Sequence, residues 1–320
     1  MIKKINFYHS LIFFNICIIL SSFAYLRDNN LIIFCLFLIL TIGISHGSLD
    51  NIKGKKLLKF LNIESKSIFY IGYSLICLLV ILFWIIFPTT VLLIFLTVAA
   101  YHFGKEDTFF LEKEKKNYDE ILYFFKGLVV IVAPLIFHKI ETVLIFQSLN
   151  FNISGIILIE DILLYILLIL SFFSSLFLFF RKNIEINSLL LMDFFSILIL
   201  NYFLNPITAF TIYFCFLHSI RHSLSLIIKL NKNIKKGFFS FVKKALPLTI
   251  ITAIFYLFAI YFLNYHYELD ESIYKVMFIG LASLTFPHIL LEYLTENKWK
   301  LMLILFLIEK KWKIKKLKFY

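Results

Sequence analysis

The sequence predicts an all-α, polytopic integral membrane helical bundle with about eight to ten transmembrane helices. Of its 320 residues 61% are hydrophobic and only 16% are charged, and the mean hydropathy is +0.90. Soluble domains are about 45–50% apolar and about 25% charged, so this apolar excess cannot be buried in one globular core. The four cysteines stand singly within apolar segments, which predicts small buried side chains rather than a metal or redox motif.

Ten apolar segments approach the roughly 20 residues that a spanning helix needs. They are residues 6–26, 31–47, 67–87, 89–104, 121–137, 156–180, 187–204, 206–228, 245–263 and 273–293. Pro88 and Pro206 divide two neighbouring pairs, which are predicted either as separate helices or as broken, re-entrant segments. No linker or repeat divides the chain, so residues 1–296 are predicted to form one membrane domain. Residues 297–320 form a basic tail, in which the apolar run 301–308 predicts an interfacial helix.

Lysines recur in every second connection, and this alternation predicts the orientation of the chain. The N-terminus and the connections around residues 53–66, 105–116 and 229–244 are rich in lysine, whereas the connection 264–272 is net acidic. By the positive-inside rule the N-terminus and these lysines are expected on the cytoplasmic side of a cell membrane. The net charge of +12 then faces anionic lipid, and nothing in the sequence requires nucleic acid as a partner.

The histidines divide into two groups in this predicted topology. Three are expected to be solvated or interfacial: His9, His138 and His266. The other five lie in the later, cytoplasmic half of segments that run from outside to inside: His46, His102, His218, His222 and His288. An ionisable side chain within a membrane helix is costly and indicates function. Five of them at one depth therefore predict a shared site.

The spacing of these histidines favours a metal centre. His218 and His222 are four residues apart, so both project from one helix face, as in helical metal sites. With His46 and His102 from two other helices they would form a shell of four neutral imidazoles, which suits iron, zinc or copper. Fe(II) with an open position can activate O2, whereas zinc with four protein ligands would be closed and structural. His288 is expected to be a further ligand or a positioning group.

Three carboxylates follow the candidate ligands by about one helical turn. Asp50 is four residues after His46, and Glu106 and Asp107 are four and five residues after His102. A ligating histidine usually donates its second ring N–H to a carboxylate or a carbonyl. Each carboxylate is therefore expected to orient the histidine of its own segment, although Glu106 and Asp107 fit ordinary loop charges equally well.

Glycine and aromatic residues flank the same positions. Gly47 and Gly104 lie within two residues of candidate ligands, where they are expected to let helix backbones approach closely. Aromatic side chains flank the histidines at Tyr101, Phe103, Phe214, Phe216 and Phe286. A long apolar ligand needs a channel of this composition, so these residues are candidates for its lining.

Four motifs, "GISHGSLD", "YHFGKED", "HSIRH" and "FPH", occur in that order within hydrophobic segments. As an ordered set they resemble the Brp/Blh family of membrane β-carotene 15,15′-dioxygenases, which accompany microbial rhodopsins. The resemblance implies that His46, His102, His218 and His222 bind Fe(2+). It also implies that O2 cleaves the central 15,15′ double bond of β-carotene, giving two molecules of all-trans retinal for delivery to a rhodopsin. His288 also falls on a motif of the family, but the resemblance does not define the role of this residue.

Three other classes of protein remain open. A membrane diiron desaturase or hydroxylase would carry clustered HxxxH and HxxHH boxes, and this sequence has one HxxxH. A bis-histidine haem carrier would pair His46 with His102, or His218 with His288, and would show a Soret band. A non-enzymatic transporter or rhodopsin-assembly factor would show polar residues at the membrane midplane and internal symmetry, and neither is evident in the sequence.

Overall fold

A computed structural model describes residues 2–22, 31–65, 67–111, 118–151, 160–181 and 184–297, and all regular structure in these ranges is helical. Eight of the described helical spans are long and apolar enough to cross a membrane, which confirms the all-α polytopic class. They are α1 (Ile2–Ser21), α2 to α3 (Ile32–Phe60), α4 (Ser67–Ile86), α6 (Asp119–Phe137), α8 (Asp161–Phe179), α11 to α12 (Pro206–Leu230), α13 (Ile234–Leu263) and α14 (Leu269–Glu296). The predicted interfacial run 301–308 lies outside the described residues.

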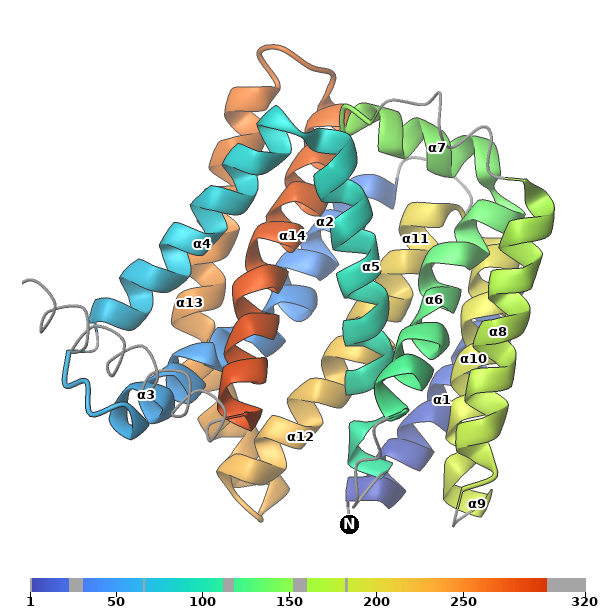
Figure 1. The fold of residues 1–320 in the computed structure, drawn as a ribbon, viewed down its shortest axis with the longest axis horizontal. Coiled ribbons are helices and arrows are strands. Elements are labelled where there is room, and N and C mark those ends of the chain that lie inside the picture. Colours follow the sequence, from blue (N-terminus) through green and yellow to red (C-terminus); the bar gives the residue numbers. More distant parts are fainter. Residues whose placement is uncertain are drawn as a thin grey trace, which may run out of the picture.

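Two further helices complete the bundle. α5 (Pro88–Glu106) packs against α6, and α10 (Leu189–Phe203) packs against α1. Pro88 and Pro206 each occupy the first turn of a new helix, where a proline has no intrahelical hydrogen bond to lose. α4 and α5 are separate antiparallel neighbours (Figure 1), so the re-entrant alternative does not hold for that pair.

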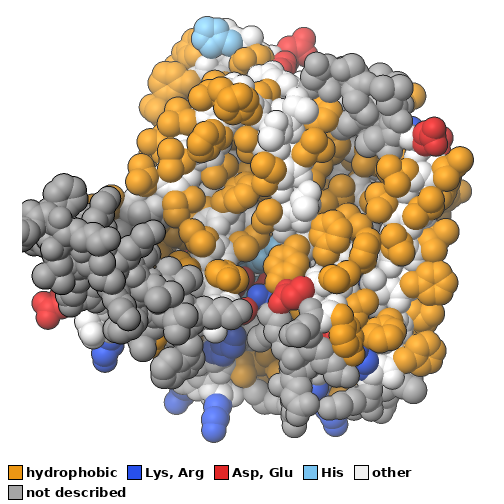
Figure 2. All heavy atoms as spheres, viewed as in Figure 1, with side chains coloured by type: hydrophobic (Ala, Val, Ile, Leu, Met, Phe, Trp, Pro, Cys, Tyr) orange, Lys and Arg blue, Asp and Glu red, His pale blue; other side chains and the backbone are white. Residues whose placement is uncertain are grey.

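Polar and apolar parts of the surface are separated along the bundle axis. The start of α1, the short helix α3 (Asp50–Phe60) and α12 (Ile220–Leu230) lie at one end, and α7 (Lys139–Ser148) lies across the other (Figure 1). Lys and Arg side chains gather mainly along the first end, whereas the sides are largely apolar (Figure 2). The lysine-rich connections of the sequence therefore meet at one end of the molecule, as an alternating topology requires.

Two π-helical segments interrupt the spans that carry candidate ligands. η3 (Ile39–Gly43) precedes the 3-10 turn η4 (Ile44–Leu49), and η7 (Tyr213–Ser219) separates α11 (Pro206–Ile212) from α12. The two segments pack together, with the Ser219 hydroxyl donating to the carbonyl of Gly43 at 3.2 Å. π-Bulges are rare and occur often at functional sites. Here one contains His218 and the other lies three residues before His46.

His9 stabilises the second π segment. Its Nε2 lies 2.8 Å from the carbonyl oxygen of Phe216, within η7. A π segment breaks the regular i to i−4 pattern, so a side chain from another helix can satisfy one of its carbonyl groups. His9 was expected to be solvated or interfacial. Instead it is half-buried between α1 and the backbone next to His218.

α5 and α6 cross at two glycines. A Cβ on Gly104 would lie 1.8 Å from the carbonyl oxygen of Tyr123, and a Cβ on Gly127 would lie 1.8 Å from that of Ala100. Only glycine allows this approach, so the expectation for Gly104 is confirmed. The expectation for Gly47 is wrong, because a Cβ there would meet no described atom within 4 Å.

Candidate metal centre

Four of the five predicted histidines converge on one buried point. His102 comes from the last turns of α5, His218 from η7, His222 from α12 and His288 from α14. The ring centroids of His102 and His218 are 5.3 Å apart, those of His102 and His288 are 5.3 Å apart, and those of His222 and His288 are 5.9 Å apart. Each side chain is at most 8% exposed. The convergence predicted from lysine positions is therefore present in the fold.

The fifth histidine, His46, lies in η4, and its side chain lies outside the described part of the structure. Its neighbours Gly47 and Ser48 line the same cavity as His102 and His288. The Ser48 hydroxyl lies 2.8 Å from that of Thr249, which ties η4 to α13. The backbone at residue 46 is thus held beside the histidine cluster.

Two carboxylates of α5 and its end hold histidines of another span. Asp107 Oδ1 accepts from His218 Nδ1 at 3.1 Å, and Glu106 Oε2 accepts from His222 Nδ1 at 2.9 Å. This differs from the expectation that Glu106 and Asp107 orient His102 of their own helix. Residues four apart on a helix point to one side, but here that side faces η7 and α12, so the carboxylates reach the neighbouring span first.

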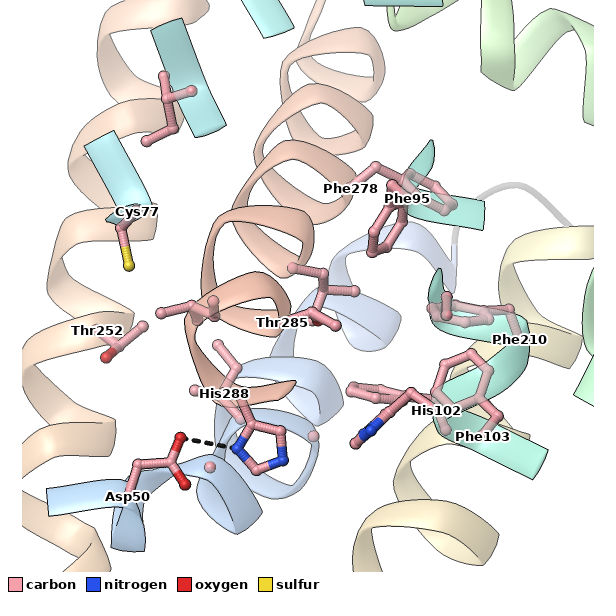
Figure 3. A pocket seen from close by; sticks show the side chains of 18 of the residues that line it. Asp50, Cys77, Phe95, His102, Phe103, Phe210, Thr252, Phe278, Thr285 and His288 are labelled. Atoms are coloured by element: carbon pink, nitrogen blue, oxygen red, sulfur yellow. Dashed lines mark hydrogen bonds and ion pairs between the residues drawn. The ribbon is translucent and has the colours of Figure 1, made fainter. Parts of the chain in front are cut away.

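Asp50 also serves a distant histidine. Its Oδ2 accepts from His288 Nδ1 at 2.7 Å, the contact drawn in Figure 3, and from the hydroxyl of Tyr73 at 3.1 Å. The sequence paired Asp50 with His46. The described contacts give it to His288, because α3 packs against α14. A contact between Asp50 and His46 stays a prediction, because the side chain of His46 lies outside the described part of the structure.

Glu292 is a member of the cluster that the sequence motifs did not single out. It lies one helical turn after His288, with Oε1 3.6 Å from Nε2 of that residue, and its Oε2 lies 3.9 Å from Nδ1 of His102. Lys53 donates to its Oε1 at 2.6 Å. The HxxxE spacing in "HILLE" was the available signal. Donor atoms lie within 4.8 Å of one another in two groups that share this residue: His102, His288 and Glu292, and Glu106, His222 and Glu292.

A buried ion-pair network also holds Asp107 in position. Its Oδ2 accepts from the hydroxyl of Tyr213 at 2.8 Å, and its backbone carbonyl accepts from Arg221 at 3.3 Å. The guanidinium of Arg221 makes a bidentate contact with Asp193 at 2.7 and 3.0 Å and donates to the hydroxyl of Ser10 at 2.6 Å. A bidentate pair has a fixed geometry. The network therefore holds Asp107, and through it His218, in one orientation.

The donor set fits a divalent cation. A histidine whose Nδ1 donates to a carboxylate presents the lone pair of its Nε2 to a metal, and the Nε2 atoms of His218, His222 and His288 are buried. Carboxylates outnumber cations in and around this cluster, and a divalent ion bound by neutral imidazoles would offset the excess of negative charge. The charged residues are Asp50, Glu106, Asp107, Asp193 and Glu292, with Lys53, Lys126 and Arg221. The buried His and Glu groups can therefore bind a metal.

A cavity of about 630 Å³ begins at this cluster and is lined mostly by apolar side chains. His102, His288 and Asp50 lie at one end of it (Figure 3). Of the aromatic residues predicted to line a channel, Phe103 and Phe214 do so. Its size is within the usual range for small-molecule sites, roughly 300–1,000 Å³.

The comparison with known families agrees with this geometry. The family model described as beta-carotene 15,15′-dioxygenase matches residues 37–296. The chain belongs to this family. A curated relative, the β-carotene 15,15′-dioxygenase of the uncultured marine bacterium 66A03, is 29% identical over 257 residues, which cover 80% of this chain and 90% of that protein. No solved structure matches the chain.

Membership in the β-carotene 15,15′-dioxygenase family confirms the resemblance seen in the four motifs. The matched range includes the whole histidine cluster and Glu292. It makes the protein a carotenoid-cleaving dioxygenase by class, an oxidoreductase with several membrane helices. It also disfavours the haem-carrier and transporter alternatives, which the motifs alone had left open.

Proposed function

We propose that this dioxygenase holds Fe(2+) with the imidazoles of His46, His102, His218 and His222 and cleaves the central 15,15′ double bond of β-carotene with O2, giving two molecules of all-trans retinal. The observation that carries the proposal is the buried cluster of His102, His218, His222 and His288. Two of its members, His102 and His288, line an apolar cavity. The family match supplies the reaction type. His288, in the same cluster, is a further donor or a group that positions the substrate.

When bound, Fe(2+) supplies the binding and activation of O2, which no side chain can do. The protein supplies geometry. Asp107 and Glu106 accept from Nδ1 of His218 and His222, which fixes the tautomer of each ring and makes its Nε2 the atom that would bind the metal. Asp50 holds His288 in the same way, so that its ring stays at the cavity wall.

The cavity orients the substrate and excludes water from the metal centre. Its lining is apolar, so a polyene can pass along it without desolvating polar groups. Holding the scissile bond beside the centre converts an encounter into an oriented reaction. We infer that the N-terminus and the metal centre lie toward the cytoplasmic side of the cell membrane. The retinal produced would remain in the bilayer, from which it could be delivered to a microbial rhodopsin.

Expression in a bacterial host that accumulates β-carotene tests the proposal. Wild-type protein, His218→Ala and His266→Ala are compared, because His266 is an exposed histidine in the connection after α13 and serves as the matched control. We expect retinal and loss of carotene colour with wild type and His266→Ala but not with His218→Ala. Purified wild-type protein should contain iron that His218→Ala lacks, and cleavage should stop without O2. An iron-loaded, folded wild type that leaves β-carotene intact, or that shows a Soret band, would contradict the proposal.

A further inference from the structure

The carboxylates beside the histidine cluster fall into two classes by their distance from a ring nitrogen. Those of the first class lie at hydrogen-bond distance from a histidine Nδ1: Asp107 with His218 at 3.1 Å, Glu106 with His222 at 2.9 Å and Asp50 with His288 at 2.7 Å. Glu292 forms the second class. Its Oε2 lies 3.9 Å from Nδ1 of His102, and its Oε1 lies 3.6 Å from Nε2 of His288. Both separations are too long for a hydrogen bond.

The separations at Glu292 are those expected between two ligands of one metal ion. First-row ions bind histidine nitrogen and carboxylate oxygen at about 2.0–2.2 Å, so two such donors at a bond angle of about 110–130° lie roughly 3.3–4.0 Å apart. One donor atom from each of His102, His288 and Glu292 lies within 4.8 Å of the other two. Two histidines with one carboxylate are a donor set of non-haem Fe(II) oxygenases.

The surroundings of Glu292 hold its carboxylate in one orientation. The residue is 8% exposed, and Lys53 donates to its Oε1 at 2.6 Å. One oxygen is therefore held by an ammonium group, while Oε2 lies on the side of His102. A carboxylate that binds a metal through one oxygen has this arrangement, because its other oxygen accepts a hydrogen bond that orients it.

We propose that Glu292 is a direct ligand of the metal through its Oε2, so that the centre combines imidazoles with one carboxylate instead of imidazoles alone. The inference rests on the proposed function for the identity of the metal. Six-coordinate iron with Glu292 bound and one position open for O2 has room for four imidazoles, so at least one of the five predicted histidines stays off the ion. The carboxylate lowers the net charge of the centre by one unit.

Metal affinity separates a ligand from a residue that only pairs with Lys53. Glu292→Gln keeps the shape of the side chain and removes the anionic donor, whereas Lys53→Met removes the same ion pair from its other partner. We expect Glu292→Gln to bind Fe(2+) more than about 100-fold more weakly than wild type, because loss of a residue that only orients a ligand costs about 10- to 100-fold. Lys53→Met removes such an orienting contact and should stay within about tenfold of wild type.

Co(2+) bound to the full-length protein in place of iron gives a second readout, because its visible absorption depends on the number and geometry of its ligands. Glu292→Asp keeps a negative charge beside Lys53 but withdraws the carboxylate by one methylene group, so its Co(2+) spectrum should differ from that of wild type. Glu296→Gln is the matched control. Glu296 lies one turn further along α14 and pairs with Lys105 at 2.7 Å, so this variant should keep the wild-type spectrum and affinity.

The outcomes separate the ligand from the reaction itself. A loss of about 100-fold or less in Glu292→Gln, or equal losses in Glu292→Gln and Lys53→Met, overturns the assignment of Glu292 as a ligand. If Glu292→Gln does not fold, Glu292→Asp decides, and a wild-type Co(2+) spectrum in that variant overturns the assignment. Wild-type protein that binds neither Fe(2+) nor Co(2+) would instead contradict the proposed function.

Discussion

The crossing of α5 and α6 gives a prediction that removes no donor atom from the metal centre. At Gly127 an added Cβ would lie 1.8 Å from the carbonyl oxygen of Ala100 and 2.8 Å from the backbone nitrogen of Gly104. Real Cβ contacts below 3.0 Å essentially do not occur, so Gly127→Ala must open the first contact from 1.8 to at least 3.0 Å, a displacement of at least 1.2 Å. Both contacts are to backbone, so no side-chain rotation can relieve them.

This displacement acts directly on the candidate ligands. His102 lies between Ala100 and Gly104 on α5, and Glu106 and Asp107 follow within one turn. A misplacement of about 1 Å at a catalytic centre can lower a rate about 10²-fold. We therefore expect Gly127→Ala to form retinal about 100-fold more slowly, measured by chromatography of retinoids and normalised to the amount of inserted protein. Helix propensity alone predicts that Gly127→Ala stabilises α6 instead of disturbing it, because alanine is favoured over glycine within a helix by about 0.5–1 kcal/mol.

Gly72→Ala is the matched control. Gly72 lies in α4, and a Cβ there would meet no described atom within 4 Å. It should keep wild-type activity and a wild-type thermal unfolding midpoint. If Gly127→Ala formed retinal at the wild-type rate with its full iron content, the close approach of α5 and α6 would not be what positions His102, and the reasoning would be refuted.

Three further outcomes follow from the same contacts. Asp107→Asn should weaken iron retention or activity about 10- to 100-fold, because the amide no longer secures the tautomer of His218; unchanged retention against a chelator would argue against this role. Arg221→Met should lower the free energy of unfolding by about 3–5 kcal/mol, because Asp193 is left as a buried charge without its partner. The double variant Arg221→Met, Asp193→Leu should recover most of this lost stability, as measured by thermal unfolding. Removal of metal with a chelator should abolish cleavage, and Fe(2+) but not Zn(2+) should restore it, because zinc has no redox chemistry with which to activate O2. Recovery with zinc would exclude the proposed chemistry.

The sequence predicted the helical membrane bundle and the gathering of histidines because both depend on local properties. Hydropathy marks a spanning segment from its own residues, and lysines mark which ends of successive segments lie on the same side of the membrane. Depth in the membrane then follows by counting along one helix. That is why His102, His218, His222 and His288 could be placed together before any helix packing was known.

The partners of these histidines could not be predicted in the same way, because they depend on how the helices pack. Residue spacing relates Asp107 to His102 within α5, but it carries no information on the rotation of α5 relative to η7, where His218 lies. The π segments add one residue per turn and change that rotation locally, and hydropathy does not report them. Glu292 was missed for a related reason. Its HxxxE spacing is common on helices and becomes meaningful only once Lys53 and His102 are seen beside it.

The crossed pairing of carboxylates and histidines predicts that residues 101–107 tolerate little change. This segment provides His102 to the cluster, Gly104 to the crossing with α6, and Glu106 and Asp107 to histidines of another span. Each carboxylate therefore positions a ligand only after α5 has packed against η7 and α12. Metal binding and helix packing are then one equilibrium, so bound metal stabilises the packed bundle, and a substitution that loosens the packing lowers metal affinity even where every donor atom remains.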